Sequence, residues 1–161
     1  MDLNFFDPSQ SYVRYTNKAY RIFCNNEKFK IKSCACTLPF GFEKFNGKII
    51  ANLEIDISNN ESYNYVTSIK NIDKNFEKKQ VFGSEQYKNE IQNLYFISSI
   101  KERQNNKVHH RCHIKNPKTF PISFLELKDK KFTADIELSN VWINGDTYGI
   151  VWMIENIIIQ I

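Results

Sequence analysis

The amino-acid sequence predicts a mostly β fold, an antiparallel barrel with a helical insertion between its early and its late strands. Short segments in the first and the last third of the chain alternate apolar with polar residues, as strands with one buried face do. Residues 59–79 have the period of a helix instead. The last segment, residues 131–161, has the pattern of a long hairpin. Strands, then helices, then strands again favour such a barrel.

The early strands are expected to follow a loosely ordered N-terminal arm. Residues 1–17 carry Pro8 and several polar residues and form this arm, and residues 18–161 form one domain. Alternating patterns predict strands at residues 20–24, 29–38 and 48–57. Between the last two, the segment PFGFEKFNGK places two glycines among three phenylalanines and is expected to be a structured loop.

The helical insertion is expected to contain two helices. The inner face of the first is formed by residues at the spacing of one helix face: Tyr65, Ile69, Ile72 and Phe76. Its start can be capped by Asn59, Asn60 or Ser62, and Ser84 caps a shorter second helix after Gly83. Further strands are predicted at residues 108–115 and 120–127.

The closing hairpin is the segment around which the prediction is organised. From Phe132 to Trp142 the apolar residues occupy alternate positions, and Asn144-Gly145 supplies two residues that tolerate a positive φ. The second strand then carries Tyr148 and Trp152 on one of its faces.

Two registers of this hairpin lead to different functions. A two-residue loop at Asn144-Gly145 pairs Ile143 with Asp146 and makes Tyr148 and Trp152 an exposed aromatic platform. A three-residue loop with a bulge pairs Ile143 with Thr147 and turns the large apolar residues, Trp142 included, inward. We favour the second register because it gathers these residues on one side. Tyr148, beside Gly149, is the better candidate for exposure.

Length and composition indicate one globular protein in the cytoplasm. The chain has 161 residues, of which 42% are hydrophobic, which suffices for a core. Its net charge of +4 permits a polyanionic partner without requiring one. No apolar run approaches the roughly 18 residues of a membrane span, and the first residues lack the pattern of a signal peptide. The four cysteines are therefore expected to be free thiols.

Two groups of residues combine the rings and cations that a single-strand binder needs. The first lies in and beside the phenylalanine-rich loop and consists of Phe42, Lys44, Phe45 and Lys48. The second is a basic stripe on and after the strand at 108–115 and consists of Lys107, Arg111, Lys115 and Lys118. Tyr148 completes the candidate set. The alternatives are that the phenylalanines plug one end of the barrel and that the stripe is an ordinary solvated strand face.

A cluster of histidine and cysteine raises the question of zinc. On a strand, His110 and Cys112 share a face that His109 and His113 do not share, so these residues cannot converge on one ion. We expect no metal and no other cofactor. The sequence has no nucleophile elbow, phosphate-binding loop or paired carboxylates, so we expect no enzymatic activity.

Three stretches in order resemble the single-stranded DNA-binding proteins of nucleocytoplasmic large DNA viruses. LPFGFEKFNGK is similar to their "PFG, aromatic, NGK" loop. VFGSEQYKNEIQNLY is similar to their helix that follows an aromatic-FG motif, and ADIELSNVWINGDTYGIVW is similar to their closing hairpin. The resemblance covers about residues 38–159, and it extends to virus-related yeast cytoplasmic linear plasmids.

This resemblance implies an OB-fold and a non-enzymatic function. The chain would bind single-stranded DNA during viral or linear-plasmid DNA replication. The implied partners are single-stranded DNA, replication proteins and further copies of the chain, without a membrane. The alternative is a protein-interaction or terminus-binding accessory factor of a replication complex, and a structural virion protein comes third.

Overall fold

The computed structural model describes residues 6–120 and 122–160 and has a mostly β fold, as the sequence predicts. Within these residues the strands are β1 (Ser11–Thr16), β2 (Ala19–Cys24), β3 (Phe29–Lys32), β4 (Phe42–Phe45), β5 (Lys48–Asp56), β6 (Phe82–Gly83), β7 (Tyr95–Phe96), β8 (Ile100–Glu102), β9 (Lys107–Ile114), β10 (Phe132–Asn144) and β11 (Thr147–Ile159). The helices are α1 (Asn60–Glu77), α2 (Glu85–Ile91) and α3 (Phe124–Leu127), with the 3-10 turns η2 (Pro8–Gln10) and η3 (Pro117–Thr119).

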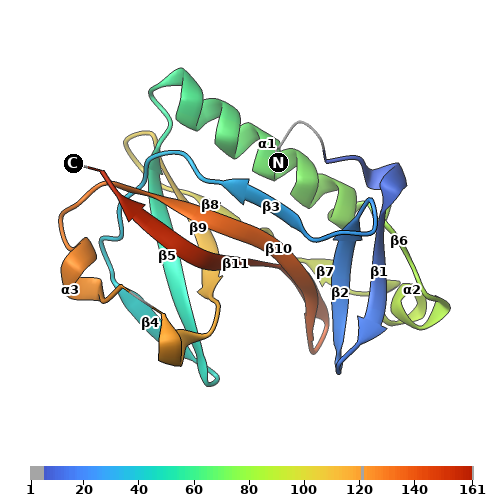
Figure 1. Cartoon of the computed structure of the whole chain (residues 1–161). Coiled ribbons are helices and arrows are strands. Elements are labelled where there is room, and N and C mark those ends of the chain that lie inside the picture. Colours follow the sequence, from blue (N-terminus) through green and yellow to red (C-terminus); the bar gives the residue numbers. More distant parts are fainter. Residues whose placement is uncertain (1–5, 121, 161) are drawn as a thin grey trace.

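All the strands join one strongly curved sheet, with α1 lying along one side of it (Figure 1). The strand order is β4-β5-β9-β11-β10-β2-β1-β6, and β3, β7 and β8 pair beside β10, β11 and β9. Within the described residues no pairing joins β4 to β6, the two ends of this order, so the sheet is not closed. The barrel expected from the sequence is therefore not confirmed, whereas the mostly β class is.

Helix α1 fills the inner side of the curved sheet and confirms the helix expected over residues 59–79. The Asn59 side chain accepts a hydrogen bond of 2.9 Å from the backbone N–H of Ser62, which identifies Asn59 as the cap. The four residues of the expected inner face, Tyr65, Ile69, Ile72 and Phe76, are all buried. The spacing of these residues therefore predicts which face of the helix packs on the sheet.

Strand β1 corrects the expectation of a loosely ordered arm over residues 1–17. Residues 11–16 pair with β2 along its whole length and bury Val13 in the core. Two successive exposed residues, Arg14 and Tyr15, interrupt the alternation on which a strand prediction depends. Residues 1–5 of the expected arm lie outside the described part of the chain.

Two other segments differ from the prediction in their secondary structure. The structured loop expected over residues 39–48 contains β4, which forms a hairpin with β5. The strand expected over residues 120–127 does not form, and α3 occupies part of this segment. The Glu126 carboxylate accepts a 2.7 Å hydrogen bond from the backbone N–H of Ser123, a side-chain cap that favours a helical turn over a strand.

The β10–β11 hairpin has a register that neither expected loop provides. Asn144 pairs with Thr147, so the loop consists of Gly145 and Asp146. Gly145 has a φ of +62°, as the first central position of a type II′ turn requires.

A β-bulge in β10 then decides which tryptophan faces the core. Leu138 lies opposite Trp152 and Asn140 opposite Val151, which leaves Ser139 as an extra residue. The alternation of faces reverses at this point, so Trp142 lies half-buried on the outer face of the sheet. The expectation that Trp142 points inward is wrong for this reason.

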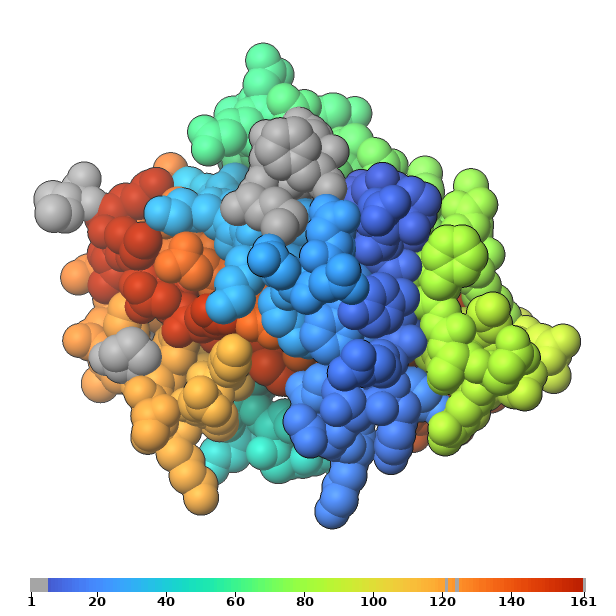
Figure 2. Space-filling model, turned by 45° about the vertical axis from the view of Figure 1, so that its right-hand side comes forward, coloured from blue at the N-terminus to red at the C-terminus, as the bar shows by residue number. Residues whose placement is uncertain are grey.

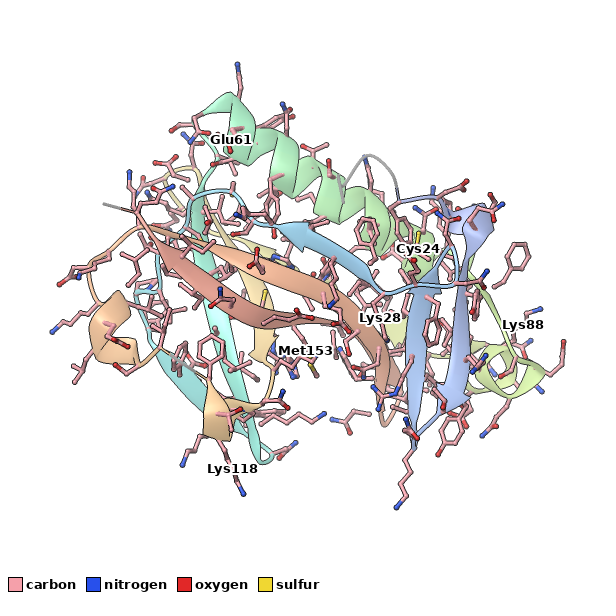
Figure 3. All side chains as sticks on the ribbon, in the orientation of Figure 1. Cys24, Lys28, Glu61, Lys88, Lys118 and Met153 are labelled. Atoms are coloured by element: carbon pink, nitrogen blue, oxygen red, sulfur yellow. The ribbon has the colours of Figure 1, made fainter. Side chains whose placement is uncertain are left out.

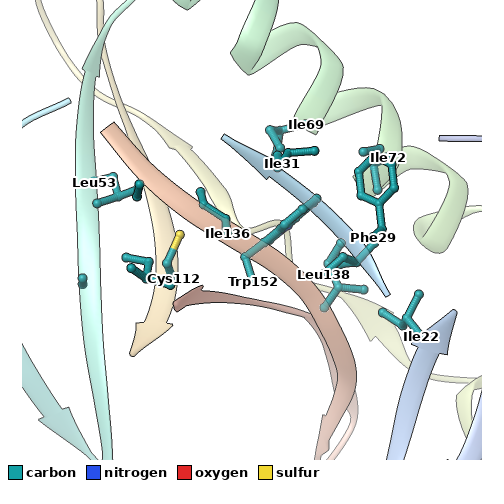
Figure 4. Close-up of a cluster of buried hydrophobic side chains, with 14 of the residues drawn as sticks. Ile22, Phe29, Ile31, Leu53, Ile69, Ile72, Cys112, Ile136, Leu138 and Trp152 are labelled. Atoms are coloured by element: carbon teal, nitrogen blue, oxygen red, sulfur yellow. The ribbon is translucent and has the colours of Figure 1, made fainter. Parts of the chain in front are cut away.

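Trp152 occupies the centre of the core, as expected for the inward-facing side of the hairpin. Its side chain is fully buried, and Figure 4 shows it between Ile136, Leu138 and Cys112. Tyr148 is also fully buried, and its hydroxyl donates a 2.7 Å hydrogen bond to the backbone carbonyl of Phe76 at the end of α1. The hairpin and α1 are therefore joined by both apolar packing and a buried hydrogen bond.

Replacing Trp152 by alanine should lower the free energy of unfolding by about 3–5 kcal/mol, because it leaves a large cavity in the core. Trp142→Ala is the matched control: it removes the same side chain from the outer face of the same hairpin and should cost roughly 1 kcal/mol. Urea unfolding followed by circular dichroism measures both values. Equal losses would contradict the positions of the two rings.

Candidate functional site

A groove of about 420 Å³ lies between the β4–β5 turn, the end of β9 and the tip of the β10–β11 hairpin. In Figure 2 the orange-red of β10 and β11 is visible at the back of a recess between the teal β4–β5 turn and the blue β1–β2 strands. The groove is lined by Phe45, Asn46, Lys48, Arg111, His113, Trp142, Ile143, Asn144 and Thr147. Aromatic rings and cations are thus brought together from three parts of the chain, and the described lining residues include no carboxylate.

The β4–β5 hairpin places an aromatic ring and a cation side by side. Asn46 and Gly47 form its two-residue turn with φ angles of 49° and 76°, the left-handed conformation of a type I′ turn. Phe45 and Lys48 are therefore directly opposite each other and share a face. Phe45 is 53% exposed, so its ring is accessible to a ligand.

Strand β9 brings Arg111 against this ring. The guanidinium carbon lies 5.5 Å from the centre of the Phe45 ring, within the range of a cation–π contact. The ion pairs found among the described residues do not include Arg111 or Lys48. Both cations therefore remain available to an anionic ligand.

Trp142 forms the opposite wall and lies on a glycine. It pairs across the hairpin with Gly149, where an added Cβ would come within 2.6–2.7 Å of three atoms of the indole. The absence of a side chain at position 149 thus lets the ring lie against the backbone of β11. Sequence reasoning missed Trp142 as a site residue, and a glycine one step after an aromatic residue in β11 was the available signal.

His113 lines the groove on the β9 side. Its Nδ1 atom is shielded from solvent and has no hydrogen-bond partner among the described residues. Burial, together with the nearby charges of Lys48 and Arg111, lowers the pKa of His113 to about 4. The imidazole is therefore neutral at physiological pH in the free protein.

An acidic network lies on the same outer face, beyond the groove. Lys115 pairs with Glu137 at 3.1 Å and with Glu155 at 3.3 Å, and Lys30 also pairs with Glu155 at 3.3 Å. Burial raises the pKa of Glu137, whereas its hydrogen bond to Glu155 lowers the pKa of Glu155 to about 2. The two lysines are thus neutralised locally by carboxyl groups.

The structure brings together three of the residues that the sequence singles out: Phe45, Lys48 and Arg111. Lys44 is exposed but precedes Phe45 by one residue, so it points to the opposite face of β4. Phe42 is half-buried and its ring packs edge-on against Phe120 with centroids 6.1 Å apart. Neither Lys44 nor Phe42 lines the groove.

The remaining expected site residues lie elsewhere. Lys107 pairs with Asp56 at 3.2 Å at the other end of β9, and Lys115 belongs to the acidic network. Lys118 is exposed on η3 and points into solvent (Figure 3). Tyr148, proposed as an exposed stacking residue, lies in the core because it pairs with Ile143, beyond the bulge at Ser139 that turns this face of β10 inward. The basic stripe is therefore not one continuous surface.

The histidines and cysteines of β9 alternate between the two faces of the sheet. His110 lies inside, where its Nδ1 is 3.1 Å from the Tyr65 hydroxyl, and Cys112 is buried on the same side. His109 lies on the outer face, with its Nε2 3.1 Å from the Glu54 carboxylate. Across residues 6–120 and 122–160, no three histidine, cysteine or acidic side chains are grouped to hold a metal ion. All four cysteines are buried free thiols.

Comparisons with known proteins add no assignment: no protein-family model, no curated protein and no solved structure matches the chain. Among the described helices, none is long and apolar enough to cross a membrane.

The contact between Trp142 and Gly149 can be measured with a double-mutant cycle. Gly149→Ala should lower the free energy of unfolding by about 1–3 kcal/mol, because the new methyl group collides with the indole. The same change in a Trp142→Ala background should cost clearly less, since the collision partner is gone. Thermal or urea unfolding of the four proteins provides the cycle, and strictly additive losses would show that the ring does not lie on Gly149.

Proposed function

We propose that this protein binds single-stranded DNA in the groove between Phe45 and Trp142, and that it carries out no chemistry on the strand. The observation that supports this most directly is the composition of the groove: among the described residues it combines two accessible aromatic rings with two cations that form no ion pair, and it has no carboxylate. Such a site can stack bases on its rings and hold phosphates with its cations. Stacking would contribute roughly 1–3 kcal/mol per base.

The surroundings of the groove favour a single strand over a duplex. Bases in a duplex are stacked on each other, so an aromatic ring can reach their faces only in an unpaired strand. A duplex would also cover a wide surface, and the outer face beside the groove carries Glu54, Glu137 and Glu155. Because Glu137 and Glu155 hold Lys115 and Lys30 in ion pairs, the described part of this face offers few free cations to a second phosphate backbone.

We propose further that the sheet is an incompletely closed relative of the OB-fold and that the protein acts in viral or linear-plasmid DNA replication in the cytoplasm. The resemblance of residues 38–159 to viral single-stranded DNA-binding proteins supports this context. The strong curvature of the sheet around α1 is compatible with the architecture. Replication proteins and a second copy of the chain are the further partners that this context suggests.

The cations of the groove should determine the salt dependence of binding. Changing Lys48 or Arg111 to glutamine should each reduce the slope of log K against log salt by about one, because each change removes one phosphate contact. Lys107→Gln and Lys115→Gln are the matched controls on the same strand or just after it, and they should leave the slope unchanged because carboxylates already engage these lysines. Fluorescence titration with oligo-dT across a salt series measures the slopes. If a control substitution reduces the salt slope as much as the Arg111 substitution does, the single-stranded DNA binds along the basic stripe instead.

The rings of the groove should determine affinity. Phe45→Ala and Trp142→Ala should each weaken oligo-dT binding by roughly 1–3 kcal/mol, while the circular dichroism of the free protein stays unchanged. Phe40→Ala, which removes an exposed ring outside the groove, is the control and should bind normally. A duplex of equal length should bind far more weakly. Absence of oligo-dT binding at low salt would contradict the proposed function and favour the accessory-factor alternative.

A further inference from the structure

His113 lines the groove together with Lys48 and Arg111, and one of its ring nitrogens lacks a hydrogen bond in the described part of the chain. His113 pairs with Ile50 of β5 on one side and with Met153 of β11 on the other, so its immediate neighbours in the sheet offer no side-chain acceptor. Its Nδ1 atom is buried and has no hydrogen-bond partner within residues 6–120 and 122–160. A buried polar atom without a partner is costly, so no hydrogen bond at Nδ1 stabilises the ring, and the side of the imidazole that lines the groove is left to a ligand.

The charged groups around His113 are predominantly positive on the groove side. Lys48 of β5 and Arg111 of β9 line the groove with it. On the far sides, Glu43 lies across Ile50 and Glu137 across Met153, each one strand further away, and neither lines the groove. Lys115, two residues along β9, is engaged by Glu137 and Glu155. The groups that face His113 across the groove therefore attract an anion.

We propose that Lys48, Arg111 and His113 form the binding site for one phosphodiester group of the bound DNA, and that His113 takes up a proton when this phosphate binds. This inference rests on the proposed function and specifies how the same groove recognises its ligand. In the free protein the two cations and the burial keep the imidazole neutral. A phosphate between them cancels the repulsion and gives the imidazolium N–H an acceptor, so the charged form becomes favourable.

The arrangement also explains why the anion would be a phosphate linking two bases. Phe45 and Trp142 lie on different walls of the groove, contributed by the β4–β5 turn and by β10. Bases stacked on the two rings would be joined by a backbone that passes the cations between them. The phosphodiester itself keeps one negative charge at all pH values of interest, so a change of affinity with pH reports on the protein.

Proton uptake on binding determines how the affinity for the DNA changes with pH. A group with a pKa of about 4 in the free protein that rises by about two units in the complex tightens binding as the pH falls. The sign follows from linkage: the complex binds more protons than the free protein in this window, so acid favours the complex. The affinity should therefore rise about tenfold between about pH 7 and about pH 5.

The test is a pH series of oligo-dT binding at constant ionic strength, because thymine and the phosphodiester do not titrate in this range. The wild-type protein should show the tenfold gain, and His113→Gln should bind with an affinity that changes less than about twofold over the same range. His109→Gln is the matched control, since it removes a histidine from the outer face of the same strand but outside the groove. It should keep the wild-type pH dependence. Circular dichroism at the lowest pH confirms that each variant is folded.

A second measurement observes the proton on the unmodified protein. The ring resonances of His113 in a nuclear magnetic resonance titration should give a higher pKa in the oligo-dT complex than in the free protein. Inorganic phosphate and thymidine monophosphate serve as competitors. If phosphate alone displaces oligo-dT at equal concentration, the three residues form a site for free anions, and the phosphodiester proposal is overturned.

The outcomes separate this inference from the proposed function. Tight oligo-dT binding with the same affinity at every pH, or with an unchanged His113 pKa, would overturn the proposed phosphodiester-binding site and leave single-strand binding intact. A pH dependence that persists in His113→Gln and disappears in His109→Gln would also overturn it. Absence of binding at every pH would overturn both.

Discussion

The packing of the closing hairpin against α1 is the constraint on which the rest of the structure depends. Trp152 and Tyr148 are fully buried on the inner face of β11, and the Tyr148 hydroxyl satisfies a carbonyl at the end of α1. The same carbonyl also accepts a 3.1 Å hydrogen bond from the backbone N–H of Lys79, so the register of the hairpin is tied to the C-terminal turn of the helix. Because β9 pairs with β11 and β5 pairs with β9, this register also places His113 and the β4–β5 turn. The groove is a consequence of how the core is packed.

Neighbouring carboxylates decide which basic residues of this protein can serve a ligand. The chain has 22 lysines and arginines, yet along β9 and just beyond it, Lys107 and Lys115 are held by acidic partners while Arg111 faces an aromatic ring. Glu155 takes part because it is the extra residue of a second bulge, where Asp135 pairs with Asn156 and Ile136 with Ile154. Positive charge is thus concentrated at one end of the outer face by the pairing of strands far apart in the sequence.

Local patterns predict the parts of this fold that depend on local physics. The spacing of Tyr65 and Ile69 predicts the buried face of α1, and the alternation in 132–138 predicts the first half of β10, because both follow from the geometry of one element. The same reasoning identifies Phe45, Lys48 and Arg111 as candidates from residue type.

What the sequence does not predict is which candidates meet. Strand pairing places Lys107 opposite Asp56, away from the groove, and the bulge at Ser139 turns the face of β10 that pairs with Tyr148 toward the core. Trp142 is missed because a bulge at Ser139 reverses the faces of β10, and a bulge is decided by the partner strand. Whether the sheet closes into a barrel likewise depends on whether its two edge strands, β4 and β6, pair with each other, and no short sequence motif specifies that.

The extra residue at Ser139 has a consequence for how such a surface can arise. One inserted residue is enough to exchange a tryptophan between the interior and the exterior of the same strand without altering a single side chain beyond it. The neighbouring glycine at position 149 then accommodates the ring on its new side. A change in the length of the gene by one codon can thus turn an interior aromatic residue into part of a binding surface, while the opposite strand keeps Trp152 in place as the interior ring.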